Sequence, residues 1–168
     1  MTEDVCDTHY EAVNWGLGEL LWFGRATGAL ADTLRAAAAG QTAELQNWLA
    51  ARLGEAAWFG GALFGWADAA VAPMVHRSVV YGMGPPAGGA LAHWYERLRE
   101  RPSVATTFAE YEASAARMPA TVALFKTGGR LREYRGHRLE WMIKSGGIEV
   151  VLAGLRDGNI RFPWPNAE

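Results

Sequence analysis

Apolar residues recur at a helical period through the first third of the chain. Their spacing by three and four residues predicts one helix over about 5–26 and a second over about 29–53. The repeating face holds Val13, Leu17, Leu20 and Leu21 on the first helix, and Leu30, Leu34, Leu45, Trp48, Leu49 and Leu53 on the second. We expect Gly28 to end the first helix and Gly54 the second. Because only two or three residues join them, the two helices are expected to lie antiparallel.

A third helix is predicted to begin directly after Gly65, within the segment Phe64-Gly-Trp-Ala-Asp68. Asp68 is spaced to accept a hydrogen bond from the backbone N–H of Gly65, as in a capping box, and Phe64 takes the place of the apolar residue in a hydrophobic staple. This assigns Asp68 to folding rather than to catalysis. Pro73 removes one backbone hydrogen bond from the helix, so a kink is expected there.

The rest of the chain shows further helical patterns separated by Gly and Pro. One is marked by Leu91, Trp94, Tyr95 and Leu98, a second by Leu131, Tyr134, Arg138, Leu139, Trp141 and Met142, and a third by Ile148, Val151, Leu152 and Leu155. Pro102 is expected to begin another helix that runs to about residue 116. The apolar segment after Met118 is left open in type, and the tail over 162–165 cannot be helical. No segment has a strand partner, so the predicted fold class is all-α, a helical bundle in one domain over residues 1–168.

Composition and charge narrow the function classes. The net charge of −2 gives no general electrostatic case for binding nucleic acid or an anionic membrane surface. The acidic N-terminus does not resemble a signal peptide, no apolar run is long enough to span a bilayer, and the single cysteine excludes an internal disulfide. We therefore expect a cytoplasmic protein with neither nucleic acid nor membrane as a partner. Eight tryptophans are typical either of a filled core or of a pocket for flat apolar ligands.

Taken together, these landmarks resemble the C-terminal helical domain of glutathione transferases. They are the antiparallel pair, the turn Trp58-Phe-Gly-Gly61 before the staple and capping box, the third helix, and Trp94 followed by Arg101-Pro102. The resemblance covers about residues 5–115, and residues 116–168 look like a C-terminal helical extension. The family usually has Ser or Thr at the cap, whereas Gly65 offers no side-chain acceptor.

The resemblance also implies a thioredoxin-like half before this domain, which binds glutathione in the family and supplies its activating Tyr, Ser or Cys. Here 63 residues precede the motif, and they are predicted to be helical. None of the family's glutathione contacts therefore carries over, and no cofactor is expected. By the same resemblance, the start of the first helix and the end of the third line a substrate pocket beside the gap that this half would fill.

Protonatable and polar side chains gather at the start of the first helix. The residues spaced to share one helical face are Cys6, His9, Tyr10, Val13 and Asn14. His9 is a candidate general acid or base and Tyr10 a candidate donor to a developing oxyanion. The candidate substrate-binding residues here are Cys6, Asn14 and Trp15. The alternative is that Cys6 fills a buried space and that His9 and Tyr10 are partly buried with satisfied hydrogen bonds.

Cys6 and His9 could also act as a nucleophile and base, or as two of the four ligands that structural zinc requires. The other histidines have no paired spacing, so no metal site is expected.

The end of the third helix provides further candidates for substrate binding, Met74, Arg77 and Tyr81, with Arg77 pairing an anionic group. The alternative places Arg77 on the surface and Met74 in the core.

The segment 126–144 holds six Lys or Arg and two Glu. These cations either receive an anionic ligand or partner, or complement the acidic first 47 residues, which is the favoured interpretation.

Three functions are compatible with this sequence. The favoured one is a small-molecule site that binds an apolar or aromatic metabolite, with acid–base catalysis by His9 and Tyr10 that does not use glutathione. The second is a protein-interaction module, as a homodimer or with a partner protein, since the face left by the absent half would be apolar. The third is the helical subunit of a split transferase that needs a thioredoxin-fold partner.

Overall fold

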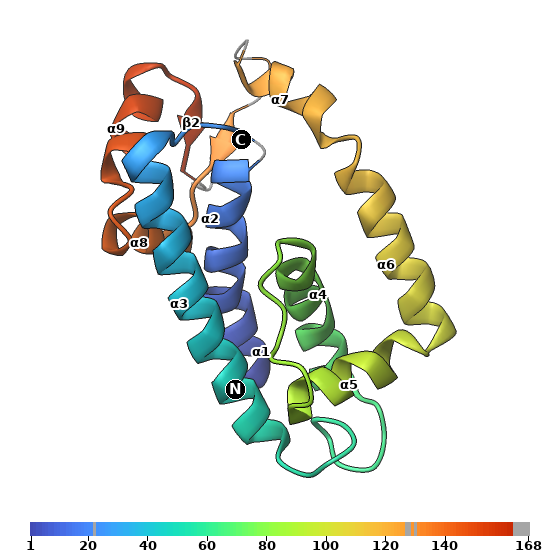
Figure 1. Ribbon diagram of the computed structural model, residues 1–168. Helices are drawn as coiled ribbons and strands as arrows, with labels where there is room; N and C mark the ends of the chain where they lie inside the picture. The colour runs from blue at the N-terminus through green and yellow to red at the C-terminus, as the bar shows by residue number, and fades with distance from the viewer. Residues whose placement is uncertain (22, 127–128, 130, 163–168) are drawn as a thin grey trace, which may run out of the picture.

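A computed structural model of the chain describes residues 1–21, 23–126, 129 and 131–162. Residue 22 of the first predicted helix, residues 127, 128 and 130 of the basic segment 126–144, and the tail beyond Phe162 fall outside the described residues, as do the side chains of residues 119, 120 and 126. The described part is built of helices with one pair of two-residue strands (Figure 1), which confirms the predicted all-α class. None of its helices combines the length and the apolar character that crossing a membrane requires.

The first helical segment contains a π-helical turn. α1 (Thr2–Val5), η1 (Cys6–Tyr10) and α2 (Glu11–Leu21) follow one another without a break. The segment ends at Leu21, earlier than predicted, and Gly28 begins the next helix instead of ending this one. α3 (Gly28–Leu53) then runs antiparallel to α2 (Figure 1), as predicted. Gly54 ends α3 with a positive φ of 57°, a backbone conformation that favours glycine.

α4 (Trp66–Val80) begins at the predicted cap and continues through Pro73. The Asp68 carboxylate accepts a hydrogen bond from the backbone N–H of Gly65 at 2.9 Å, which confirms its role in folding. It also accepts hydrogen bonds from the backbone N–H of Phe59 at 3.0 Å and from Nε1 of Trp94 at 2.8 Å. Asp68 is completely buried, so this single carboxylate joins the loop before α4, the start of α4 and the helix that carries Trp94.

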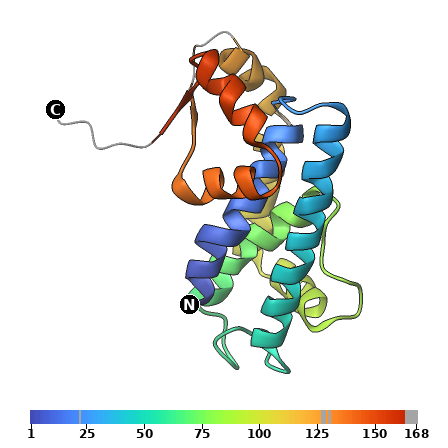
Figure 2. The same ribbon diagram turned by 90° about the vertical axis from the view of Figure 1, so that its left-hand side faces the viewer.

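The later helices lie on two sides of the antiparallel pair formed by α2 and α3. α5 (Ala90–Arg99) contacts α3, and α6 (Pro102–Ala115) leads away from it to α7 (Met118–Lys126), the segment whose type the sequence leaves open. α8 (Gly136–Lys144) returns to pack on α2, and α9 (Ile148–Arg156) packs on α8; both lie on the same side of the molecule in Figure 2.

The helix predicted from Leu131 onward begins only at Gly136, because the residues before it form a strand. β1 (Arg132–Glu133) pairs in parallel with β2 (Ile160–Arg161). The backbone N–H of Tyr134 extends this pairing with a hydrogen bond to the carbonyl oxygen of Arg161. The segment 148–152, whose pattern also suits a strand, is helical.

Two buried clusters hold the helices together. One lies between α2, the N-terminal half of α3, α8 and α9, and includes Leu17, Leu34 and Met142. The other joins η1, the C-terminal half of α3, α4 and α5 around Tyr10 and Trp94. α2 contributes to the first cluster along its whole length and α3 along its N-terminal half, and η1 and the C-terminal half of α3 contribute to the second.

Acidic residues of α2 hold the C-terminal segment in place. Glu19 is buried, accepts a hydrogen bond from the Tyr134 hydroxyl at 2.7 Å and forms an ion pair with Arg132. Glu11 pairs with Arg138. The favoured interpretation of the basic segment, that it complements the acidic start of the chain, is therefore confirmed for Arg132 and Arg138, within one chain.

Candidate functional site

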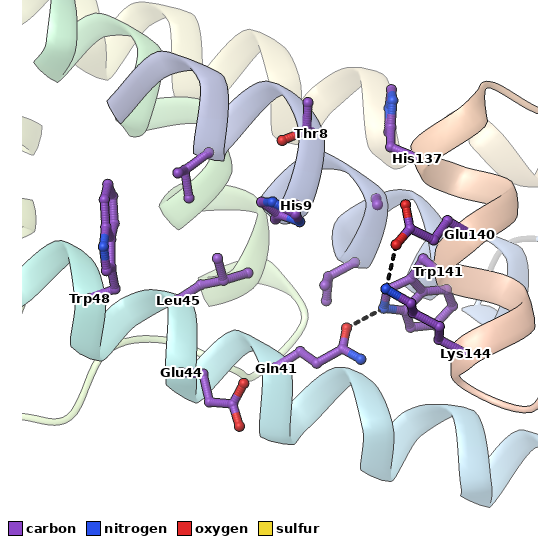
Figure 3. A pocket seen from close by; sticks show the side chains of 13 residues that line it. Thr8, His9, Gln41, Glu44, Leu45, Trp48, His137, Glu140, Trp141 and Lys144 are labelled. Carbon is purple, nitrogen blue, oxygen red and sulfur yellow. Dashed lines mark hydrogen bonds and ion pairs between the residues drawn. The ribbon is translucent and has the colours of Figure 1, made fainter. Parts of the chain in front are cut away.

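A cleft of about 810 Å³ opens between η1 and α2, α3, and α8 (Figure 3). We call it the His9 cleft. Its apolar lining is Val5, Ala12, Val13, Leu45, Trp48 and Trp141, and its polar lining is Thr8, His9, Gln41, Glu44, His137, Glu140 and Lys144. The volume lies in the range of small-molecule sites, which are commonly apolar clefts with a few polar groups.

Each helix presents one stripe of side chains to the cleft. On α3 these are Gln41, Glu44, Leu45 and Trp48, and on α8 they are His137, Glu140, Trp141 and Lys144. Both sets are spaced by three and four residues, the spacing that places side chains on one helical face. None of these residues is among the site residues predicted from the sequence, although their mixed polar and aromatic spacing is a signal that could have identified them.

Trp141 is fixed at one end of the cleft by two contacts. Its ring lies directly on Gly16, where an added Cβ would come within 2.1 Å of ring atom Cζ3. Its Nε1 donates a hydrogen bond to Oε1 of Gln41 on the opposite wall (Figure 3). The glycine therefore allows α8 to approach α2, and the amide of Gln41 fixes the ring's orientation.

An ion-pair network flanks the cleft at the junction of α2 and α8. His137 Nε2 lies 2.8 Å from Oε2 of Glu11, and Arg138 binds the same carboxylate through Nε at 3.0 Å. Burial alone would raise the pKa of Glu11, but the hydrogen bonds and charges of Arg138 and His137 outweigh it and lower the pKa. Glu11 is therefore ionised at neutral pH and holds α8 against α2.

His9 lies at the mouth of the cleft, where its side chain is exposed (Figure 3). Across from it, Glu140 is paired with Lys144. The pKa of Glu140 is lowered mainly by its hydrogen bond from Lys144 and to a smaller extent by the charge of His9. The imidazole is thus open to solvent and close enough to Glu140 to affect its ionisation.

The π-helical turn separates His9 from three of the residues predicted to share its face, whereas Val13 lines the cleft with it. Cys6, Tyr10 and Asn14 are fully buried and do not line the His9 cleft. The Tyr10 hydroxyl accepts a hydrogen bond from Nε2 of Gln46 at 3.0 Å, and burial raises its pKa. Burial also raises the pKa of Cys6 to about 12, so the thiol is protonated at neutral pH. These buried positions match the alternative set out for Cys6, while His9 is exposed.

Asn14 and Trp15 both contact protein groups. Asn14 donates from Nδ2 to the carbonyl oxygen of Met74 at 3.0 Å and accepts a hydrogen bond from the Ser78 hydroxyl at 3.1 Å. Trp15 packs edge-on against Tyr134, with the guanidinium of Arg138 5.2 Å from its ring centre. These contacts join α2 to α4 and to the C-terminal segment.

The candidates at the end of α4 lie apart from the His9 cleft. Met74 and Arg77 line a second cleft, between α4 and α6, and Arg77 Nε donates to the Tyr81 hydroxyl at 3.2 Å. The start of the first helix and the end of α4 are joined by packing around Asn14, and neither of these two clefts is lined by candidates from both places. Within the described residues, no three His, Cys, Asp or Glu side chains are grouped so that they could hold a metal ion.

Comparison with known proteins identifies part of this architecture. The family model for the glutathione S-transferase, C-terminal domain, matches residues 32–97. The matched segment covers most of α3, all of α4 and most of α5, so it includes the α3 wall of the His9 cleft and not the α2 and α8 walls. No curated protein and no solved structure matches the chain.

Proposed function

The chain carries a helical domain of the glutathione S-transferase C-terminal family, and from this premise we propose that it binds a small apolar or aromatic molecule in the His9 cleft. The observation that carries the proposal is the lining of the cleft, in which Trp48 and Trp141 provide aromatic surface and Ala12 and Val13 are buried. An exposed rim holds the polar residues Thr8, His9, Glu44, Glu140 and Lys144. Such a lining suits a flat ligand that buries its apolar faces and turns one polar group toward the rim.

His9 is the residue proposed to exchange a proton with the bound molecule without glutathione. An imidazole titrates near neutral pH and can act as acid or base. His9 lines the cleft and is exposed, so a ligand can reach its ring nitrogens. Tyr10 was the other catalytic candidate, but its hydroxyl is bonded to Gln46 away from the cleft, so the proposal uses His9 alone.

The binding step is tested by tryptophan emission, titrated with a panel of neutral aromatic compounds such as indole, naphthol and coumarin. We expect saturable quenching in the wild type and weaker quenching in Trp48→Phe. His9→Ala should weaken binding of hydroxylated ligands by about fivefold, the loss of one hydrogen bond of about 1 kcal/mol. His93→Ala is the matched control, because His93 is an exposed histidine on α5 outside the cleft. A panel that leaves the emission unchanged would refute the proposal.

An apolar stripe on α9 favours the second candidate function, a homodimer or a complex with a partner protein. Ile148, Leu152 and Leu155 are spaced by four and three residues, and 38%, 39% and 49% of their surface is exposed. Exposed apolar patches of this kind often mark interaction surfaces. Analytical ultracentrifugation of the wild type and of Leu152→Lys tests this candidate. A monomer in both cases excludes self-association through α9.

A further inference from the structure

The second cleft, between α4 and α6, is a groove of about 390 Å³ with different chemistry from the His9 cleft. Its lining is mostly apolar and comprises Phe64, Ala69, Ala72, Pro73, Met74, His76, Arg77, Ser103, Val104, Thr107, Phe108 and Tyr111. We call it the α4–α6 groove. None of these residues lines the His9 cleft, so the two are separate places on the molecule.

The groove runs along both helices. Near its start, Arg101, which precedes α6, lies with its guanidinium 4.1 Å from the ring centre of Phe64, which precedes α4. About two helical turns further along α6, Phe108 stacks on His76 of α4 with ring centres 3.7 Å apart. Ala69 and Arg77 mark the extent of the lining on α4, and eight residues of α-helix span about 12 Å.

His76 and Phe108 form part of the lining of the groove. His76 is buried, its Nδ1 lies 2.7 Å from the Tyr95 hydroxyl, and burial lowers its pKa. The Glu112 carboxylate lies 3.4 Å from Nε2 of the same ring. The imidazole is therefore neutral at neutral pH and packs face to face on Phe108, so a chain of methylene groups would contact the outer surface of this ring pair.

Arg77 and Tyr111 make the polar end of the groove. Nε of Arg77 donates to the Tyr81 hydroxyl at 3.2 Å, and its guanidinium lies 6.0 Å from the Tyr81 ring centre. Burial raises the pKa values of Tyr81 and Tyr111. Both phenols are thus neutral at neutral pH, so their hydroxyls keep the proton that can be donated in a hydrogen bond. The end of an apolar groove therefore carries a cation together with phenolic hydroxyls.

We propose that the α4–α6 groove binds an amphipathic carboxylate, with the unbranched apolar chain along α4 and α6 and the carboxylate at Arg77 and Tyr111. A guanidinium and a phenol both donate hydrogen bonds to a carboxylate, and a partly desolvated charge pair is stronger than one in water. The apolar lining between Phe64 and Met74 would remove the chain from water. An extended chain of decanoate matches the length of groove between Ala69 and Arg77.

Isothermal titration calorimetry with decanoate, below its micelle concentration, and with decanol tests this assignment. The wild type is expected to bind one decanoate. Arg77→Gln should weaken decanoate binding by at least tenfold and leave decanol binding within twofold, whereas Arg77→Lys should retain most of the affinity. Arg35→Gln is the matched control, because Arg35 is a surface arginine on α3 that pairs with Asp32. Circular dichroism establishes that each variant is folded.

Two blocking variants locate the ligand. Ala69→Trp places a large ring at an exposed position of the groove and should abolish decanoate binding, while Glu44→Trp fills the His9 cleft and should leave it unchanged. The proposal is overturned if the wild type does not bind decanoate, if Arg77→Gln binds it as the wild type does, or if Glu44→Trp rather than Ala69→Trp removes binding. Because the probes and variants differ, these results do not depend on whether aromatic compounds bind at His9.

Discussion

Replacing Asp68 by alanine removes the one acceptor shared by three buried or partly buried donors. These are the backbone N–H groups of Gly65 and Phe59 and the indole N–H of Trp94. A hydrogen bond to a charged group contributes about 1.5–3 kcal/mol, and a buried donor left without a partner costs a comparable amount. The carboxylate itself is costly to bury, which offsets part of the gain.

We expect Asp68→Ala to lower the free energy of unfolding by roughly 4 kcal/mol. This is a large fraction of the total free energy of unfolding of a typical domain, which is about 5–15 kcal/mol. Asp68→Asn can still accept from Phe59 and Trp94 through Oδ1, but its NH₂ group would face the Gly65 N–H. The asparagine variant should therefore lose less, roughly 2 kcal/mol.

Urea denaturation followed by circular dichroism measures both losses, and an unchanged m-value establishes that only stability has altered. Trp94→Phe removes the indole donor and serves in a double-mutant cycle, because its cost should be smaller in the Asp68→Ala background than in the wild type. A loss below about 1 kcal/mol for Asp68→Ala, or strict additivity in the cycle, would show that the carboxylate does not join these elements.

Three further predictions concern the first helical segment. Gly16→Ala should lower the free energy of unfolding by about 1–3 kcal/mol, because its methyl group collides with Trp141, and Trp141→Leu should relieve that loss in the double variant. Urea denaturation of the three variants checks this. Glu11 has a lowered pKa in the folded state despite its burial, so its contribution to stability is present above its ordinary value of 4.5 and is lost as the pH falls below it. Glu11→Gln should therefore lose less stability than the wild type between about pH 6 and pH 3, and equal losses would contradict the role of Arg138. Cys6, whose pKa is raised from 9.0 to about 12, should react with a maleimide at neutral pH roughly a thousandfold more slowly in the folded protein than in urea, and similar rates would show that the thiol is accessible.

The helices of the matched segment could be predicted from local rules. α3 begins and ends within a residue or two of its expected limits because a long apolar period and the glycine at its end agree. The start of α4 follows from Gly65 and Asp68, whose spacing already specifies their hydrogen bond. The hydrogen bonds of Asp68 with Phe59 and Trp94 join separate parts of the fold, and no local sequence pattern predicts them.

The candidate site was less predictable, because helical spacing was applied to a segment that is not an ideal α-helix. The π-helical turn at Cys6–Tyr10 places His9 at the cleft and turns its neighbours Cys6 and Tyr10 inward. The walls opposite His9 come from α3 and from α8, which is distant in sequence. α8 is positioned by the packing of Trp141 on Gly16 of α2 and by its hydrogen bond to Gln41 of α3, and no contiguous motif predicts these contacts. Met74 and Arg77 line one cleft, as their spacing suggested, but its other wall is α6 and not the start of the first helix.

The contact between Glu11 and His137 spans 126 positions of the chain. During synthesis at about 5–20 residues per second, α2 would wait for roughly 6–25 s before the last wall of the His9 cleft leaves the ribosome. The nascent helix must keep its apolar side from aggregating over that interval, with α3 and then α4 as its early cover. A ligand of the cleft could bind only after this delay, so occupancy would report that α8 has joined α2 and α3.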